Sequence, residues 1–511
     1  MTYRLRIFSL AAGVAFAATC AFAGPSDNSL VVAIATDFVM ADPAVGTLGT
    51  DIPLLYVMYD RLIAFNPEDL TPQPMLATDW SWSDDKKTLT LELREGVKFH
   101  DGTDFNAEAV KKSLEYFRDS GRNKDLVGLT KIEVLAPNKV ALTMEEVNSQ
   151  LPGLLAERAG MIMSPTALEK YGADYSKNPA GTGPYKLREH VTGQAVIFEK
   201  FEDYWDPDAA KLDRIEFRVL KSATSAVAAI MTGQIDYLAN VDPVNVPAME
   251  SNPNVRVSFE PTIGYGVLKL DTSVEPIDKK EVRQAFSLAV DRQALAKALF
   301  GNVPAFGTVL PAPRHYWPST DAVQDSIRYD PEKAKSLLAE AGYPNGATVN
   351  VCVNAGLGMP LPSLKIMDIM SEQMKPAGFS LDVTQSASTA ACSDLMNKKE
   401  AATILLTWSG RSDPATTYTQ MMASNNMLPN STFNVAKRDY GADELLKELN
   451  ATFDQAEQDK IYDKLNALFV EEYPFMPLYA FANVVAYRKG LAGEVPNGLG
   501  RPYVRTLHWE Q

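Results

Sequence analysis

The stretch ATILLTWSGRSDPATTYTQMM, residues 402–422, is the part of the sequence that decides the fold class. An apolar, β-prone run at 403–408 ends abruptly in a cluster of turn formers at 409–414. The pattern predicts a buried strand that delivers an indole, a guanidinium and a carboxylate to its carboxyl end. Ligands of open α/β sheets bind outside this end, so the turn is a candidate small-molecule site. The alternative is a surface turn in which Asp413 caps the next helix and Trp408 belongs to the core.

The N-terminus has the pattern of an export signal. Arg4 and Arg6 precede a short apolar, alanine-rich segment that ends in Ala21-Phe22-Ala23. This arrangement predicts a Sec signal peptide, residues 1–23, and is too short for a membrane span. We therefore expect a soluble periplasmic protein. A lipid-anchored protein is the alternative, although the residues around Cys20 match a lipid-attachment site poorly.

The charge excludes some classes of partner. Cleavage after Ala23 would remove two of the 49 basic residues and none of the 64 acidic ones, which leaves a formal charge of −17. Such a surface repels nucleic acid and anionic lipid. We expect a freely diffusing monomer that does not bind nucleic acid.

Two cysteines, Cys352 and Cys392, follow the predicted signal peptide. In an oxidising compartment they could form a disulfide, although spacing alone does not show whether their Cα atoms are close enough. Two buried free thiols are the alternative.

The order of predicted elements is that of a mixed α/β (α+β) protein. A strand at 29–35 precedes a helix at 52–62, and one long amphipathic helix is expected at 281–299. Short strands at 484–487 and 503–506 return to an early layer. About 490 residues exceed what one hydrophobic core supports, so two or more lobes are expected.

Several segments together resemble the periplasmic peptide-binding family, the solute-binding proteins of ABC importers typified by dipeptide- and oligopeptide-binding proteins. The matching strings, in the order of that family, are WSWSDDKKTLTLELREGVKFHDGTDFNAEAVKKSLE, GTGPYKL with FEDYWDPDAAKLDRIEFRV, AAIMTGQIDY, EVRQAFSLAVDRQALAKALF, YDPEKAKSLLAEAGYPNG and YPFMPLY. They span most of the chain that follows the signal peptide.

The resemblance implies a bilobed, clamshell-like solute-binding protein with an extra small α+β subdomain and no catalytic activity. Lobe I would be discontinuous, formed by residues 24–60, 180–268 and 485–511. The small domain would be 61–179 and the second lobe 269–484. The ligand would be trapped between the lobes and passed to an inner-membrane permease.

The resemblance also assigns roles to the turn at 408–413. Asp413 matches the aspartate that pairs with the α-ammonium of a bound peptide in related proteins. Trp408 would supply a flat apolar wall, or else belong to the core. Ser409 and Gly410 would contribute backbone groups.

Arg411 marks a departure from the dipeptide-binding pattern. Dipeptide-binding members carry an Arg-Pro pair after the strand that corresponds to 348–353, and it receives the ligand carboxylate. Here residues 354–360 contain no arginine. Arg411 could replace it, because a guanidinium forks onto a carboxylate, or it could be a solvated turn residue.

Phe38 and Tyr265 follow or lie in strands that face the presumed cleft, and they are further candidate ligand contacts. The alternative for both is ordinary core packing.

No motif of a catalytic, metal or cofactor site stands out. An SxxK and an SDN string occur, but in reversed order and without a KTG, and the four histidines are scattered. We therefore expect capture of short peptides for import, without cofactor or catalysis. The alternative cargoes are an opine, glutathione, a sugar conjugate, haem or nickel. An exported hydrolase or chaperone is an alternative from another class.

Overall fold

The computed structural model describes residues 27–46, 51–67, 69–120, 125–301, 321–354, 363–408, 410, 411, 413–424, 433–493, 498–500 and 503–510. For residues 261, 321, 481 and 482 it describes the backbone alone. The predicted signal peptide and Ser409 lie outside the described residues. Among the described residues, no helix combines the length and apolar character needed to span a membrane.

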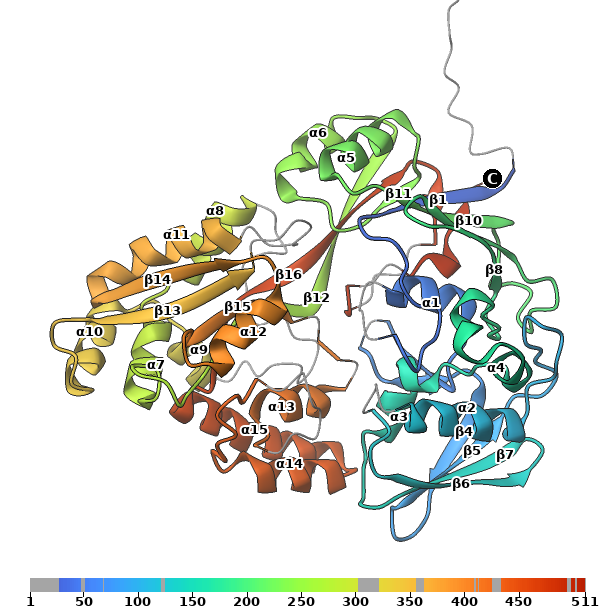
Figure 1. The fold of residues 1–511 in the computed structure, drawn as a ribbon, viewed down its shortest axis with the longest axis horizontal. Helices are drawn as coiled ribbons and strands as arrows, with labels where there is room; N and C mark the ends of the chain where they lie inside the picture. Colours follow the sequence, from blue (N-terminus) through green and yellow to red (C-terminus); the bar gives the residue numbers. More distant parts are fainter. Residues whose placement is uncertain are drawn as a thin grey trace, which may run out of the picture.

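A ten-stranded sheet runs through both lobes of the molecule (Figure 1). Its strand order is β14-β13-β15-β12-β16-β11-β1-β10-β9-β8. The strands are β1 (Ser29–Ile34), β8 (Tyr185–Val191), β9 (Ala195–Lys200), β10 (Arg214–Val219), β11 (Tyr237–Leu238), β12 (Val255–Leu270), β13 (Ala347–Asn354), β14 (Phe379–Ser386), β15 (Thr403–Trp408) and β16 (Phe475–Arg488). We call the half from β11 to β8 the sheet of lobe I, and β14-β13-β15 the sheet of lobe II.

Two long antiparallel strands connect the lobes. β12 has 16 residues and β16 has 14, and each runs from one lobe into the other. Their register shifts between Pro261 and Tyr265 and again between Gly266 and Val267. Irregular pairing bends and twists strands locally, so these shifts mark the hinge between the lobes.

Beside lobe I lies a four-stranded antiparallel sheet of β4 (Ala77–Trp82), β5 (Thr88–Leu93), β7 (Lys139–Met144) and β6 (Leu129–Ala136). With α2 (Ala107–Asp119), α3 (Leu151–Leu155) and α4 (Pro165–Tyr171) we call it the small domain. Asn106 starts α2 as sequence patterns predict, because its Oδ1 accepts a hydrogen bond from Ala109 N at 3.0 Å. The apolar side of α2 shares one hydrophobic core with lobe I.

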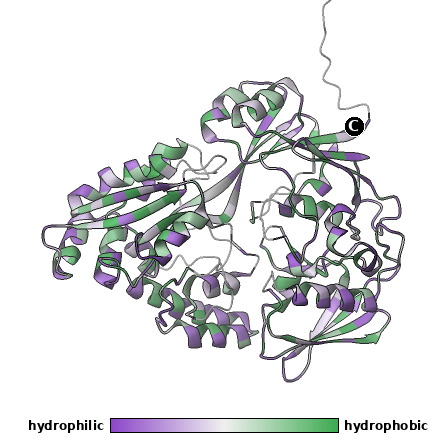
Figure 2. Cartoon of the chain, viewed as in Figure 1, coloured by the Kyte–Doolittle hydropathy of each residue, from purple (hydrophilic) through white to green (hydrophobic). Residues whose placement is uncertain are grey.

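Lobe II has a separate hydrophobic core, formed where helices pack against its sheet. The helices are α7 (Lys280–Leu288), α8 (Arg292–Phe300), α9 (Asp321–Ser326), α10 (Pro331–Glu340), α11 (Ser363–Met374), α12 (Thr389–Asn397), α13 (Pro414–Met422), α14 (Ala442–Ala451) and α15 (Gln455–Glu472). β13 pairs in parallel with both β14 and β15. Figure 2 shows hydrophilic and hydrophobic positions side by side along α14 and α15, as expected for helices with one buried face.

Several predicted elements differ from the structure. The helix expected at 52–62 is α1 (Ile52–Met58), and the short strand expected at 484–487 is the last part of the long strand β16. The single helix expected at 281–299 is two helices, because the side chain of Asp291 accepts a hydrogen bond from Ala294 N at 2.9 Å and caps α8. The strand expected at 503–506 is a short 3₁₀ turn, Val504–Thr506. The C-terminal segment still returns to lobe I, since Trp509 Nε1 donates to Ser29 O at 2.9 Å.

A buried ion pair fastens this returning segment to lobe I. Arg505 Nη2 lies 2.8 Å from Asp60 Oδ1, and the two side chains are 6% and 0% exposed. Tyr204 OH and Trp205 Nε1 also donate to the Asp60 carboxylate, at 3.1 and 2.8 Å. Removing one partner of such a pair leaves an uncompensated buried charge.

We therefore expect Arg505→Met to lower the free energy of unfolding by about 3–5 kcal/mol. Urea denaturation would measure it. Lys177→Met is the matched control, because the Lys177–Asp174 pair is exposed and its loss should leave the free energy of unfolding nearly unchanged. Equal small effects of both variants would contradict this account.

Candidate ligand site between the lobes

The turn after β15 carries the candidate site, and local sequence determines its shape. β15 pairs antiparallel with β12, with Trp408 opposite Tyr265. Gly410 has a φ of +74°, and an added Cβ would lie 2.3 Å from Ile263 Cδ1 on the hinge strand. Only glycine adopts this conformation in so little space, so the turn packs directly on the hinge.

Asp413 caps α13, the helix that follows the turn. This is the capping role that the sequence analysis gives as the alternative to ligand binding. Its Oδ1 accepts hydrogen bonds from Ala415 N at 2.8 Å and Thr416 N at 3.3 Å. This use of Oδ1 does not exclude a ligand, because a carboxylate has further acceptor positions.

The same carboxyl group faces the other lobe. A Cβ added to Gly153 in α3 would lie 3.1 Å from Asp413 Cβ and 3.5 Å from Oδ2. Packing between the lobes removes water from the carboxyl, and this desolvation raises the pKa of Asp413 to about 6 despite the two backbone hydrogen bonds. Asp413 therefore lies where lobe II contacts the small domain, a boundary that we call the seam. No cation lies beside its carboxyl group among the described residues.

Arg411 spans the same seam. Its Nη2 lies 3.6 Å from Asp125 Oδ1 of the small domain, and the two side chains are 27% and 7% exposed. The guanidinium is thus half-buried and already engaged with an anion of the opposite lobe.

Further contacts, which we call the clasp, join the small domain to lobe II beside the turn. Ser149 N donates to Asn450 O at 2.8 Å, and Gln150 Nε2 donates to Asn450 Oδ1. Thr416 Oγ1 donates to Gln150 Oε1 at 2.6 Å. Figure 1 shows α13 and α14 opposite α3 across this seam. The clasp brings the small domain and lobe II together beside Asp413.

Trp408 and Tyr265 lie side by side on adjacent strands of lobe II. The Trp408 ring is half-buried and meets Phe433 edge-on, with centroids 5.7 Å apart. Its Nε1 is buried and has no hydrogen-bond partner. Tyr265 is 1% exposed and belongs to the core of lobe II, which fits the alternative of core packing.

Phe38 belongs to a different part of the molecule. It follows β1, is 6% exposed in the core of lobe I, and lies 6.1 Å from the His190 ring. No described contact joins it to the turn after β15, so core packing accounts for its position.

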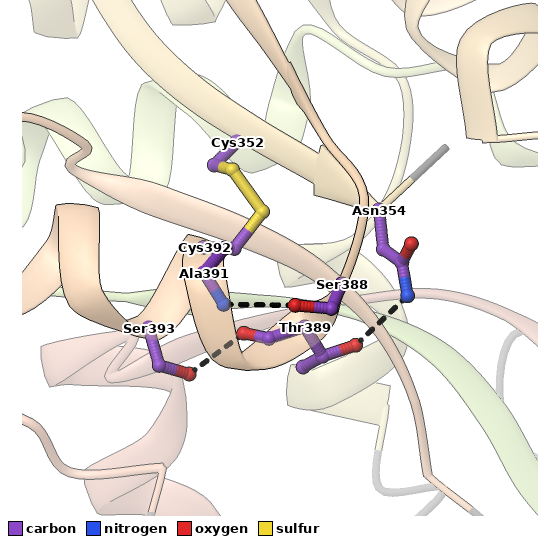
Figure 3. The surroundings of a disulfide bond; sticks show 7 residues. All are labelled: Cys352, Asn354, Ser388, Thr389, Ala391, Cys392 and Ser393. Atoms are coloured by element: carbon purple, nitrogen blue, oxygen red, sulfur yellow. Dashed lines mark hydrogen bonds between the residues drawn. A yellow bond between two sulfur atoms is a disulfide. The ribbon is translucent and has the colours of Figure 1, made fainter. Parts of the chain in front are cut away.

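Cys352 on β13 and Cys392 on α12 form a disulfide, with an S–S distance of 2.00 Å and Cα atoms 5.5 Å apart (Figure 3). Ser388 Oγ caps α12 by accepting from Ala391 N at 3.2 Å, and Asn354 Nδ2 donates to Thr389 Oγ1 at 3.2 Å. The disulfide and the bond from Asn354 hold α12 against β13. β13 belongs to the same sheet as β15, the strand that leads into the candidate site.

Sequence reasoning missed the residues of the small domain that face the turn. Asp125, Gln150 and Gly153 contribute to the seam, yet their partners in lobe II lie far away along the chain, 266 residues for Gln150 and Thr416 and 300 for Gln150 and Asn450. No local pattern marks such residues. Within the described ranges, no group of three or more potential metal-ligating side chains occurs.

The clasp predicts a measurable change in shape. In the ligand-free protein, Gln150→Ala with Asn450→Ala should shift the equilibrium toward the open form by about 1–2 kcal/mol, because the hydrogen bonds across the seam are lost. Small-angle X-ray scattering would detect this as a larger radius of gyration.

The matched control is Asn138→Ala, which removes a side-chain hydrogen bond to Glu95 inside the small domain. It should leave the radius of gyration unchanged. An unchanged radius in the double variant, with melting temperature preserved, would show that the clasp does not hold the lobes together.

Comparisons with known proteins agree with this architecture. The model of the bacterial extracellular solute-binding proteins, family 5 Middle, matches residues 71–428. The glutathione-binding protein GsiB of Shigella flexneri is 30% identical over 509 residues, covering 96% of each chain, and GsiB of Escherichia coli K12 gives the same values.

Solved structures show the same fold. The dipeptide-binding protein of Pseudoalteromonas sp. SM9913, in complex with Met-Leu, has a TM-score of 0.81 at 22% identity, covering 94% of this chain and 100% of that one. The agropinic acid complex of AgaA from A. tumefaciens R10 has a TM-score of 0.77 at 24% identity, covering 94% and 99%. The chain belongs to family 5 of the bacterial extracellular solute-binding proteins.

Proposed function

We propose that this protein is the periplasmic binding component of an ABC importer and that it captures short peptides with a free amino terminus. One observation carries the proposal: the Asp413 carboxyl lies in the seam between the lobes, with no cation beside it among the described residues. An ammonium group that leaves water needs a charged partner and further acceptors. Asp413 offers both at the place where a ligand would be enclosed.

Lobe closure supplies the means of capture. A ligand shifts a protein toward the closed form only through contacts that the open form lacks. A bound ammonium would compensate the buried Asp413 carboxylate and so favour closure, with residues of both lobes around it. The closed complex, a monomer in this proposal, would then be recognised by an inner-membrane permease after export by the predicted signal peptide.

We extend the proposal to Arg411 as the receptor for the ligand carboxylate. A guanidinium presents five donors in a planar fork and can hold two carboxylates at once. The pair with Asp125 keeps Arg411 at the seam, so a ligand carboxylate would share the guanidinium with Asp125 or displace it.

Glutathione is the second candidate cargo, because the curated relatives at 30% identity are glutathione-binding proteins. Glutathione also has a free α-ammonium and peptide groups, so it presents to Asp413 the same chemistry as a linear peptide.

A thermal-shift screen of the mature protein tests the proposal. Its panel holds di-, tri- and longer peptides, their N-acetylated forms, glutathione and opines. A ligand at one hundred times its dissociation constant stabilises the folded form by about 2.7 kcal/mol, which raises the melting temperature visibly. Stabilisation by free-amine peptides but not by acetylated ones supports the proposal. Stabilisation by a non-peptide alone would overturn the peptide assignment.

Asp413→Asn separates the two roles of this residue. Asparagine keeps a side-chain oxygen for the cap but removes the charge, so we expect the affinity for free-amine peptides to fall by about 2 kcal/mol or more. Isothermal titration calorimetry would measure it. Asp330→Asn, at the cap of α10, is the matched control and should bind as the wild type does. An unchanged dissociation constant in Asp413→Asn would remove Asp413 from the site.

Affinity should also depend on pH in a predictable direction. The pKa of Asp413 lies at about 6 in the ligand-free fold, above its ordinary value of 3.8. The fold therefore holds the proton more tightly than the unfolded chain does, and ionisation of Asp413 destabilises the ligand-free fold as pH rises from 4 to 6.

Ligand binding should follow the opposite trend, because an ammonium ion needs the ionised carboxylate. Below pH 6 the affinity for trialanine should fall by up to about tenfold per pH unit. Titrations from pH 7.5 to 4.5 would show this, and Asp413→Asn should flatten the profile. A flat wild-type profile would mean that Asp413 does not meet the ammonium.

A further inference from the structure

Gln420 in α13 is buried with both ends of its side-chain amide unpaired. It is 1% exposed, and within the described part of the chain neither Nε2 nor Oε1 has a hydrogen-bond partner. Two other buried groups of the same region lack partners as well, Thr417 Oγ1 and Trp408 Nε1.

These groups lie on the side of α13 that faces the seam. With 3.6 residues per turn, Asp413, Thr416, Thr417 and Gln420 fall on one side of the helix. Asp413 abuts Gly153 and Thr416 bonds to Gln150, so this side is turned toward the small domain.

Trp408, the last residue of β15, lies near α13. Phe433 N donates to Gln420 O at 2.9 Å, and the Phe433 ring lies 5.7 Å from the Trp408 ring. The backbone of Gln420 and the ring of Trp408 therefore both contact Phe433.

The other buried polar groups of α13 are satisfied. Thr419 Oγ1 donates to Ala415 O at 2.9 Å, and Tyr418 OH donates to Asn466 Oδ1 at 2.6 Å. A buried polar group that is left unpaired destabilises the fold, because its hydration is lost without a replacement. The unpaired groups on one side of the helix point to a partner that comes from outside the chain.

We infer that Gln420, together with Thr417 and the Trp408 indole, forms a polar subsite for the peptide groups of the bound solute. The inference rests on the proposed function and narrows its ligand class. A carboxamide accepts from a peptide N–H and donates to a peptide C=O, and the hydroxyl and the indole N–H add two more donors.

The position of the subsite limits the length of the solute. Gln420 is seven residues beyond Asp413, about 10 Å along the helix axis, and helical side chains lean back toward the N-terminus. An extended peptide spans about 3.5 Å per residue. With its ammonium at Asp413, a solute would present its second or third residue to Gln420.

The first measurement needs no ligand. Gln420→Met keeps the length of the side chain and removes the amide. Thr417→Val keeps the branched shape of the side chain and removes the hydroxyl. Since neither group has a hydrogen-bond partner among the described residues, the melting temperatures of the ligand-free variants should be unchanged or higher. Thr419→Val, which removes a satisfied hydroxyl, is the matched control for loss of an internal bond.

The second measurement uses trialanine and its depsipeptide, in which an ester oxygen replaces the second peptide N–H. Calorimetry of the wild type should show about tenfold weaker binding of the depsipeptide, the scale of one hydrogen bond to a buried group. Gln420→Met should bind trialanine about tenfold more weakly and lose the preference for the amide, because the two changes remove one shared interaction. Thr419→Val should keep both affinities.

Either of two results would overturn the inference. A markedly lower melting temperature of ligand-free Gln420→Met would mean that the amide is satisfied internally, through buried water. An undiminished preference for the amide in Gln420→Met would mean that the solute does not meet Gln420. If the wild type binds no peptide, the proposed function fails instead, and the ligand-free melting temperatures alone decide whether Gln420 awaits an outside partner.

Discussion

The antiparallel pairing of β12 and β16 is the constraint on which the rest of the structure depends. The chain enters lobe II along β12 and leaves it along β16, so any movement of the lobes must bend these two strands. Their register shift lies at Pro261–Tyr265, and the next strand, β15, joins β12 from Tyr265 onward. The turn at Gly410 therefore packs on the hinge itself, through Ile263. Under the proposed function, a ligand at this turn would act beside the irregular stretch of the two strands that connect the lobes.

The placement of Asp413 combines two opposing electrostatic effects. The hydrogen bonds from Ala415 N and Thr416 N favour the ionised carboxylate, whereas enclosure by α3 disfavours it. The effect of enclosure is the larger one, so the pKa of Asp413 is raised. The carboxyl group can approach α3 this closely because residue 153 is a glycine and has no side chain in the way. The closed seam without ligand thus holds a group that would be stabilised by a cation, which is the property that a site for an ammonium requires.

The features of the candidate site that depend on local sequence patterns could be predicted from the sequence. The buried strand at 403–408, its turn and the capping role of Asp413 follow from apolar alternation and turn residues, and the structure contains them. The break after α7 was missed because Asp291 interrupts a run whose apolar period continues on both sides. The partners of Arg411 and Thr416 could not be predicted, since Asp125 and Gln150 meet them only when two lobes come together. Phe38 looked like a cleft residue because it follows a strand end, yet the His190 ring and the core of lobe I surround it.

Lobe II contains two buried arginines whose guanidinium groups are hydrogen-bonded within the chain. Arg292 donates to the carbonyl oxygens of Pro477, Ser287 and Ile327, and Arg283 donates to those of Glu472, Ile277 and Asp278. Single unpaired atoms occur elsewhere, for example Gln373 Oε1, but the same amide donates through Nε2 to Asp291 O. Among the buried side-chain amides of the described residues, Gln420 is the one with both ends unpaired. Because the chain supplies acceptors for two buried guanidinium groups, the unpaired amide of Gln420 on the seam side of α13 supports the inference that its partner comes from outside the chain.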